Sequence, residues 1–151
     1  MPQLARTGVS LEDDLLHDFD RLIAKRGYKN RSEALRDLIR EALISDVIDS
    51  NQPVVGTLTL IYDHHQPDLT QKLIEAQHHA HGMVLANTHV HLDGEYCLET
   101  IMLQGRSKEI REMSDRILSL RGVKHGKLVL TGTGNEFSES KGHAHAHPHA
   151  H

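Results

Sequence analysis

The chain has 151 residues, of which 38% are apolar and only 3% aromatic, so it suits one domain or two small ones with a thin aliphatic core that oligomerisation would complete. It has no run approaching 18 apolar residues and no apolar N-terminal stretch, which excludes a membrane span and a signal peptide. A single cysteine excludes an intramolecular disulfide and fits the cytoplasm, and a net charge of −4 gives no general attraction to polyanions.

Residues 1–50 predict one strand followed by two helices. Polar and apolar residues alternate over residues 6–11, which is the pattern of a half-buried strand. Apolar residues then recur at helical spacing over residues 15–23, and Gly27 is a typical residue to end that helix. Asn30, with a glutamate three residues later, resembles the capping box that begins a second amphipathic helix.

This N-terminal segment is too small to fold alone, because its single strand would have no partner. A two-fold dimer in which the strands pair antiparallel solves the problem, and such a ribbon fits the major groove of DNA. Three outward ribbon positions and three at the start of the second helix are the candidate DNA contacts: Arg6, Gly8, Ser10, Asn30, Arg31 and Ser32.

The charge of residues 1–50 leaves an alternative open. They carry 8 basic and 10 acidic side chains, which would suit a dimerisation module that does not bind DNA. Five basic residues and one acid nevertheless fall within residues 25–36, where the phosphate contact is expected. The local charge therefore favours DNA binding.

Residues 49–53 read as a linker, and the chain after them alternates between strands and helices. The strand patterns cover residues 54–62, 83–92, 96–103 and 127–131, and the helical patterns cover residues 67–79 and 110–120. The order β-α-β-β-α-β predicts a ferredoxin-like sheet with helices on one face, whose other face would pack on a partner or take a ligand. The whole chain is thus predicted as α+β, with domains at residues 1–50 and 51–132 and a disordered, His-rich tail at residues 133–151.

Histidine is the compositional anomaly, with 14 residues, and the most informative segment is THVHLDGEYCLE, residues 88–99. His89 and His91 are two apart in a predicted strand, so their side chains point to the same face. Their neighbours Val90 and Leu92 are expected to point the other way, into the core.

The register of the hairpin that follows decides where Cys97 lies. A two-residue turn would direct the cysteine away from the histidines. A three-residue loop at residues 93–95 places Cys97 opposite His91 and Glu99 opposite His89, and it pairs apolar with apolar residues on the other face. Because a slip of one residue flips every side chain, the apolar pattern favours the three-residue loop.

Two imidazoles and a thiolate on one face predict a transition-metal site, since these ligands suit Zn, Cu, Ni or Fe rather than Mg or Ca. Glu99 would lie beside them as a hydrogen-bond acceptor. The nearby segment QHHAH, residues 77–81, could supply a fourth ligand, from the same subunit or from another. His64 and His65 fall in a predicted loop and are expected to be solvated, at most weak metal ligands.

Three segments together resemble one protein family. GYKNRSEALRDLIREAL (residues 27–43), QHHAH (77–81) and HVHLDGEYC (89–97) are similar to the NikR-type nickel-responsive transcriptional regulators, and the resemblance covers about residues 5–132. It implies a homotetramer, a dimer of dimers, in which a core of ferredoxin-like (ACT-like) domains is flanked by two ribbon–helix–helix dimers that bind operator DNA.

The same resemblance implies how nickel is bound. His89, His91 and Cys97 of one subunit hold Ni(II), and His78 of a neighbouring subunit completes a square-planar site. Nickel binding then orders the helix that bears His78 and favours DNA binding. The implied function is a cytoplasmic repressor of nickel-uptake genes.

Further roles follow from the resemblance. Tyr62 and Glu99 match positions that support the nickel ligands, while Glu33 and Asp37 match positions that hold a cation between the two domain types when DNA is bound. Gly8 departs from the family, which usually has Ser or Thr at this middle outward position of the ribbon. The departure removes one side-chain contact with DNA.

Three other functions compete with this one. The first is an ACT-like regulator that senses a small molecule or another metal, zinc or copper. The second is an enzyme with Cys97 as nucleophile and His91 as base, for which the sequence offers no glycine-rich turn as an oxyanion hole. The third is metal storage or delivery through the tail. The sequence therefore predicts a regulator without enzymatic activity.

Overall fold

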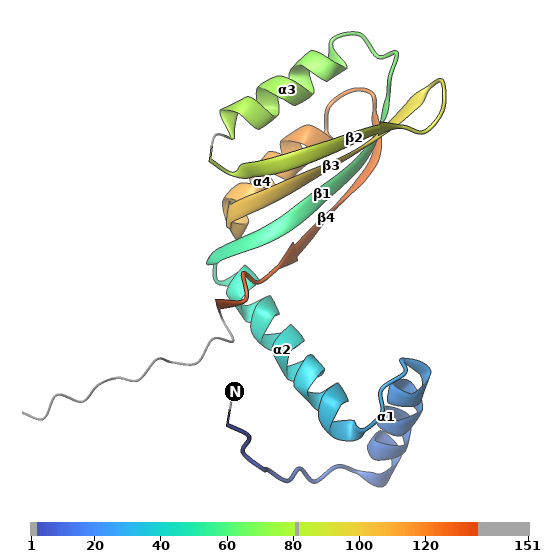
Figure 1. Cartoon of the computed structure of the whole chain (residues 1–151), viewed down its shortest axis with the longest axis vertical. Helices are drawn as coiled ribbons and strands as arrows, with labels where there is room; N and C mark the ends of the chain where they lie inside the picture. The colour runs from blue at the N-terminus through green and yellow to red at the C-terminus, as the bar shows by residue number, and fades with distance from the viewer. Residues whose placement is uncertain (1–2, 81, 136–151) are drawn as a thin grey trace, which may run out of the picture. The chain divides into compact units, whose positions relative to one another are not determined.

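The computed structural model describes residues 3–80 and 82–135, and the chain divides into two compact units (Figure 1). The first unit contains the residues up to Ala42, and the second runs from Leu43 to Thr133. The tail predicted at residues 133–151 lies almost wholly outside the described residues. In the described part of the chain, no helix is both long enough and apolar enough to cross a membrane.

The first unit contains the helix α1 (Asp13–Lys25) and most of the helix α2 (Arg31–Asp49). The strand predicted over residues 6–11 is not formed. Residues 3–12 are exposed, and none of them pairs with a strand of this chain. The physical reason is that a lone strand has no neighbour to take its backbone N–H and C=O groups. One chain cannot build a two-stranded ribbon.

The predicted ends of these helices are confirmed. Gly27 has a φ of 79°, and it ends α1 with two backbone hydrogen bonds, from Tyr28 N–H to Ile23 C=O (3.0 Å) and from Gly27 N–H to the carbonyl of Ala24 (3.1 Å). This is the Schellman arrangement, which glycine favours because φ is positive. Asn30 begins α2, since its Oδ1 accepts the backbone N–H of Glu33 at 2.9 Å.

The second unit has the predicted βαββαβ order. Its elements are β1 (Pro53–Asp63), α3 (Leu69–His79), β2 (Val84–His91), β3 (Tyr96–Arg106), α4 (Ser107–Leu118) and β4 (Val123–Thr131). The strands form one antiparallel sheet in the order β2-β3-β1-β4 (Figure 1). The α+β fold class is therefore confirmed for this unit.

The predicted linker at residues 49–53 is held by hydrogen bonds. Asn51, with a φ of 53°, turns the chain after α2, and its Oδ1 accepts the backbone N–H of Lys108 at 3.0 Å. The hydroxyl of Ser107 donates to the carbonyl of Ile48, and the backbone N–H of Ser107 donates to the carbonyl of Gln52 at 3.3 Å. The last turn of α2 is thus fixed to the first turn of α4.

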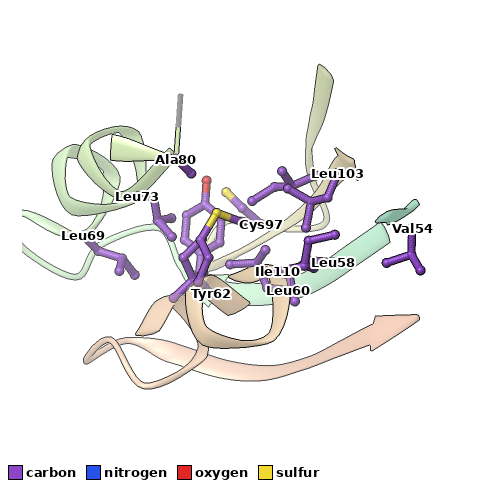
Figure 2. Close-up of a cluster of buried hydrophobic side chains, with 13 residues drawn as sticks. Val54, Leu58, Leu60, Tyr62, Leu69, Leu73, Ala80, Cys97, Leu103 and Ile110 are labelled. Carbon is purple, nitrogen blue, oxygen red and sulfur yellow. The ribbon is translucent and has the colours of Figure 1, made fainter. Parts of the chain in front are cut away.

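The core lies between the sheet and the two helices that cover one face of it. Alternate residues of β1 and β3 are buried and pack against side chains of α3 and α4 (Figure 2). The buried strand and helix residues are Val54, Leu58, Leu60, Tyr62, Cys97, Ile101, Leu103, Leu69, Leu73, Ile110, Met113 and Ile117. Cys97 is fully buried and belongs to this cluster.

The expectation that Val90 and Leu92 face the core is wrong. Their side chains are 44% and 54% exposed, and Val90 pairs with Leu98 on the face without helices. The predicted register holds, but α3 and α4 cover the opposite face, which carries the histidines and Cys97. Met102 is 40% exposed on the uncovered face as well, so both faces of this sheet carry apolar residues and alternation alone does not identify the covered one.

Candidate metal centre

Three potential metal ligands meet between the β2–β3 hairpin and the loop that follows β1. The Sγ atom of Cys97 lies 3.3 Å from Nδ1 of His91 and 3.7 Å from Nδ1 of His64. The three ligand atoms all lie within 4.8 Å of one another. Cys97 is buried while both histidines are exposed, so the cluster has one side toward the core and one toward solvent.

The hairpin builds half of this cluster, and its predicted register is confirmed. His91 of β2 pairs with Cys97 of β3. Two positions further along the hairpin, His89 pairs with Glu99. The loop is the predicted three-residue loop, in which Asp93 Oδ1 accepts the backbone N–H groups of Glu95 and Tyr96, each at 2.8 Å. These two bonds lower the pKa of Asp93, so its carboxylate remains charged and holds the loop.

The third member, His64, was predicted to be a solvated loop residue, yet the structure brings it to Cys97. Its backbone N–H donates to the carbonyl of Glu95 at 2.7 Å, and Nε2 of His65 lies 2.8 Å from the carbonyl oxygen of Gly94. The pairing of β1 with β3 explains the approach, because Tyr62 lies opposite Cys97 and His64 follows two residues later. The predicted ferredoxin-like order gives the sheet, but no motif in the sequence gives the register that brings His64 to Cys97.

His89 lies next to the cluster but outside the set of three ligand atoms. Its Nε2 is 3.4 Å from the hydroxyl of Tyr62, and the centre of its ring is 5.0 Å from that of His91. Tyr62 therefore contacts a predicted ligand.

His78 lies at the end of α3 and is also outside the set of three. It lines an open cleft of about 480 Å³ between α3 and the sheet. The cleft is lined by Tyr62, Thr70, Leu73, Ile74, Gln77, His78, Asn87, His89 and Glu99. One chain thus places His78 and His89 around the same cleft but does not bring His78 to Cys97; His81 lies outside the described residues.

A buried carboxylate connects α3 with β2 and β3. Glu99 is only 5% exposed, and its Oε1 accepts hydrogen bonds from Nε2 of Gln77 (2.9 Å) and Nδ2 of Asn87 (3.1 Å). Asn87 also donates to Oε1 of Gln77 at 2.9 Å. Sequence reasoning anticipated Glu99 but missed both amides, although Gln77 begins the QHHAH segment.

Replacing Glu99 with alanine is expected to destabilise the fold by about 1–3 kcal/mol, because Gln77 and Asn87 lose their shared acceptor. Urea unfolding followed by circular dichroism measures the change. Glu95→Ala is the matched control, since Glu95 is exposed and its removal should change the free energy of unfolding by less than about 0.5 kcal/mol. Equal effects of the two substitutions would contradict a structural role for the network.

Burial raises the pKa of two groups at the core side of the cluster, the thiol of Cys97 and the hydroxyl of Tyr62. Burial raises the pKa of the Cys97 thiol; the neighbouring hydroxyl of Tyr62 partly opposes this effect, and the charges of Asp93 and Glu99 add to it. Burial, followed by the charge of Glu99, raises the pKa of Tyr62 to about 12. Cys97 is therefore a thiol at neutral pH, and a metal that binds its sulfur must displace a proton.

The predicted DNA contacts fall into two groups. Arg6, Gly8 and Ser10 are exposed in the segment before α1. Arg31 lies in the first turn of α2, where its guanidinium makes two hydrogen bonds to Asp20, at 2.8 and 2.9 Å. That pairing lowers the pKa of Asp20.

The remaining predicted residues lie on the first turns of α2. Asn30 caps the helix, and Ser32 beside it is exposed. Glu33 and Asp37 are four residues apart, which places them on one face of the helix. Asp37 accepts hydrogen bonds from the hydroxyl of Tyr28 (2.8 Å) and from Arg40 (3.1 Å).

Comparison with known proteins decides the family. Residues 55–131 match the NikR C-terminal nickel-binding domain, and residues 5–45 match the ribbon-helix-helix proteins of the copG family. The chain belongs to the NikR family of nickel-responsive regulators. The prediction of a ribbon–helix–helix domain followed by an α+β metal-binding domain is thereby confirmed, and so is that of a regulator rather than an enzyme.

Relatives named as nickel-responsive regulators match most of the chain. One from Trichlorobacter lovleyi is 49% identical over 132 residues, which cover 87% of this chain and 95% of the relative. One from Geobacter metallireducens is 47% identical over 137 residues, covering 90% and 99%. One from Solibacter usitatus is 50% identical over 137 residues, with the same coverage of 90% and 99%.

Proposed function

We propose that this NikR family protein is a cytoplasmic repressor whose binding of Ni(II) promotes binding to operator DNA, with nickel-uptake genes as its targets. The observation that carries the proposal is the hairpin, which places His91 opposite Cys97 with His89 on the same face. The chain presents these donors within a domain of the family's nickel-binding type. A thiolate beside imidazoles is a ligand set that suits a late transition metal.

The nickel ligands are His89, His91 and Cys97 of one subunit and His78 of a second. Three nitrogens and a thiolate give a strong ligand field, which favours a planar d8 ion. A fourth ligand from another copy is supported by the place of His78, which borders the cleft in its own chain without joining the cysteine. Tyr62 would orient His89 through its hydroxyl, 3.4 Å from the ring nitrogen.

The oligomer is a homotetramer, a dimer of dimers. Support comes from the face of the sheet that the helices leave uncovered, where Val90, Met102 and Val129 are 44%, 40% and 52% exposed. Apolar side chains on one sheet face are usually covered in the native assembly.

Glu99 would support the nickel site through α3. It accepts a hydrogen bond from Gln77, the neighbour of His78, so that α3 is fixed close to the metal site.

DNA binding is assigned to the first unit. Residues 6–11 of two subunits would pair as a ribbon in the major groove, with Arg6, Gly8 and Ser10 facing the bases. The N-terminus of α2, with Asn30, Arg31 and Ser32, would hold a phosphate. In support, residues 3–12 are exposed and unpaired as a strand in one chain.

Two further features complete the proposed regulator. Glu33 and Asp37 would hold a cation between the domains in the DNA complex. Because the two binding equilibria are linked, nickel strengthens DNA binding and DNA strengthens nickel binding by the same factor, typically about 5–150-fold.

The test is a selection of binding sequences from a random pool of duplex DNA by the full chain. We expect a palindromic operator to be enriched with one equivalent of Ni(II) per chain, and not with a chelator or with amino acids in place of nickel. DNase footprinting on that operator measures the nickel dependence. Enrichment of the same sequence without metal, or no enrichment under any condition, would defeat the proposed function.

A further inference from the structure

An ion pair joins the two helices of the first unit at the start of α2. Arg31 donates two hydrogen bonds to the carboxylate of Asp20 in α1, from Nε at 2.9 Å and from Nη2 at 2.8 Å. The two side chains are 55% and 42% exposed, so the pair lies at the surface. Exposed pairs usually stabilise a fold little, because water solvates both partners when they separate. The pair is therefore a candidate for a role other than stability.

The pairing occupies only one edge of the guanidinium. Arginine has five N–H donors, and the carboxylate of Asp20 takes the one on Nε and one on Nη2. The other edge keeps donors on Nη1 and Nη2, in the fork geometry that matches a phosphate. Among the described residues, the structure gives the Arg31 guanidinium no partner other than Asp20, so this second edge is available to an anion.

Holding the guanidinium in this way prepares it for binding. A free arginine side chain adopts many rotamers, and fixing one of them when a ligand arrives costs conformational entropy. The two bonds to Asp20 fix the guanidinium beforehand. Arg31 is also the first residue of α2, and the N–H groups in the first turn of a helix lack partners within the helix and attract a phosphate. The held side chain and the helix start therefore suit the same phosphate.

We propose that Asp20 is a positioning residue for DNA binding, which holds the guanidinium of Arg31 so that its second edge binds a backbone phosphate. The inference rests on the proposed function, in which Arg31 contacts DNA. It gives an expectation opposite to that of charge alone. Removing an acidic group normally strengthens binding to the negative phosphates, whereas removing Asp20 should weaken it.

The experiment measures operator binding by the full chain with saturating Ni(II), from the fluorescence anisotropy of labelled operator at several salt concentrations. Asp20→Ala is expected to weaken binding about three- to tenfold, the usual cost of ordering a long side chain on binding. It should also reduce the dependence of the binding constant on salt, as Arg31→Ala does, because a phosphate contact is lost. Asp18→Ala is the matched control, since it removes the same charge from the same helix while Asp18 pairs with Arg21 rather than with α2. The control should bind as tightly as the unmodified chain or more tightly.

A double-mutant cycle separates positioning from other effects of the substitution. In the Arg31→Ala background, Asp20→Ala should no longer weaken binding, because no guanidinium is left to position. Two results would overturn the inference: operator binding by Asp20→Ala that is as tight as that of Asp18→Ala, or a loss by the same factor with and without Arg31. Thermal unfolding checks that each variant is folded.

Failure of this inference differs from failure of the proposed function. If the unmodified chain binds the operator without metal, the proposed function is defeated, but the comparison of Asp20→Ala with Asp18→Ala still decides the role of Asp20. If the unmodified chain binds no DNA under any condition, both are defeated.

Discussion

Replacing Cys97 with alanine is expected to lower nickel affinity by more than about 100-fold and to abolish nickel-dependent protection of the operator. Loss of a side chain that merely supports a metal ligand typically costs 10–100-fold in affinity, and Cys97 is proposed as a ligand itself. It is also the single thiol of the chain, so no other side chain replaces its soft sulfur. Chelator competition and DNase footprinting measure the two effects.

The control for this variant must separate loss of metal from loss of fold. Cys97 is fully buried, but alanine differs from it by one heavy atom, so the unfolding midpoint without metal should move little. Ser119→Ala makes a truncation of the same size at the exposed end of α4, and it should keep the nickel response. A folded Cys97→Ala protein that still gives a nickel-dependent footprint would place the regulatory metal on other residues.

The hairpin shows which part of a site is predictable from sequence. Its register was predicted from the apolar pairing of Val90 with Leu98, a local pattern within about ten residues, and the structure has that register. The caps at Gly27 and Asn30 were predictable for the same reason, because a cap depends on residues within one helical turn. Features that depend only on residues close together in the sequence can therefore be predicted without knowledge of the fold.

Non-local features were missed. His64 reaches Cys97 because β1 pairs with β3, and nothing in the loop sequence itself specifies that neighbour. The face that carries Val90 was expected to be buried, but both faces of the sheet carry apolar residues, and the helices decide which face is covered. The strand at residues 6–11 depends on a contact still further away, since its partner would be another chain.

Leu58→Ala is expected to destabilise the second unit by about 2–5 kcal/mol, the usual cost of removing a large buried side chain and leaving a cavity. Leu58 has no exposed surface and lies among the buried side chains of the core (Figure 2). In the middle of β1 it pairs with Ile101 of β3 and Leu128 of β4. Urea unfolding measures the loss. Leu85→Ala is the control, because Leu85 is 59% exposed and its truncation should cost less than about 0.5 kcal/mol.

The Leu58→Ala variant also tests whether packing of the core affects metal binding. Leu58 is not one of the proposed ligands, although it belongs to the same buried cluster as Cys97, so the folded variant should bind nickel with normal affinity. Saturating nickel should then stabilise the variant and the unmodified protein by the same amount, which is about 2.7 kcal/mol at a free concentration 100 times the dissociation constant. A smaller gain for Leu58→Ala would mean that the cavity spreads to the metal centre, and that the cluster around Cys97 depends on the packing beneath it as well as on the hairpin.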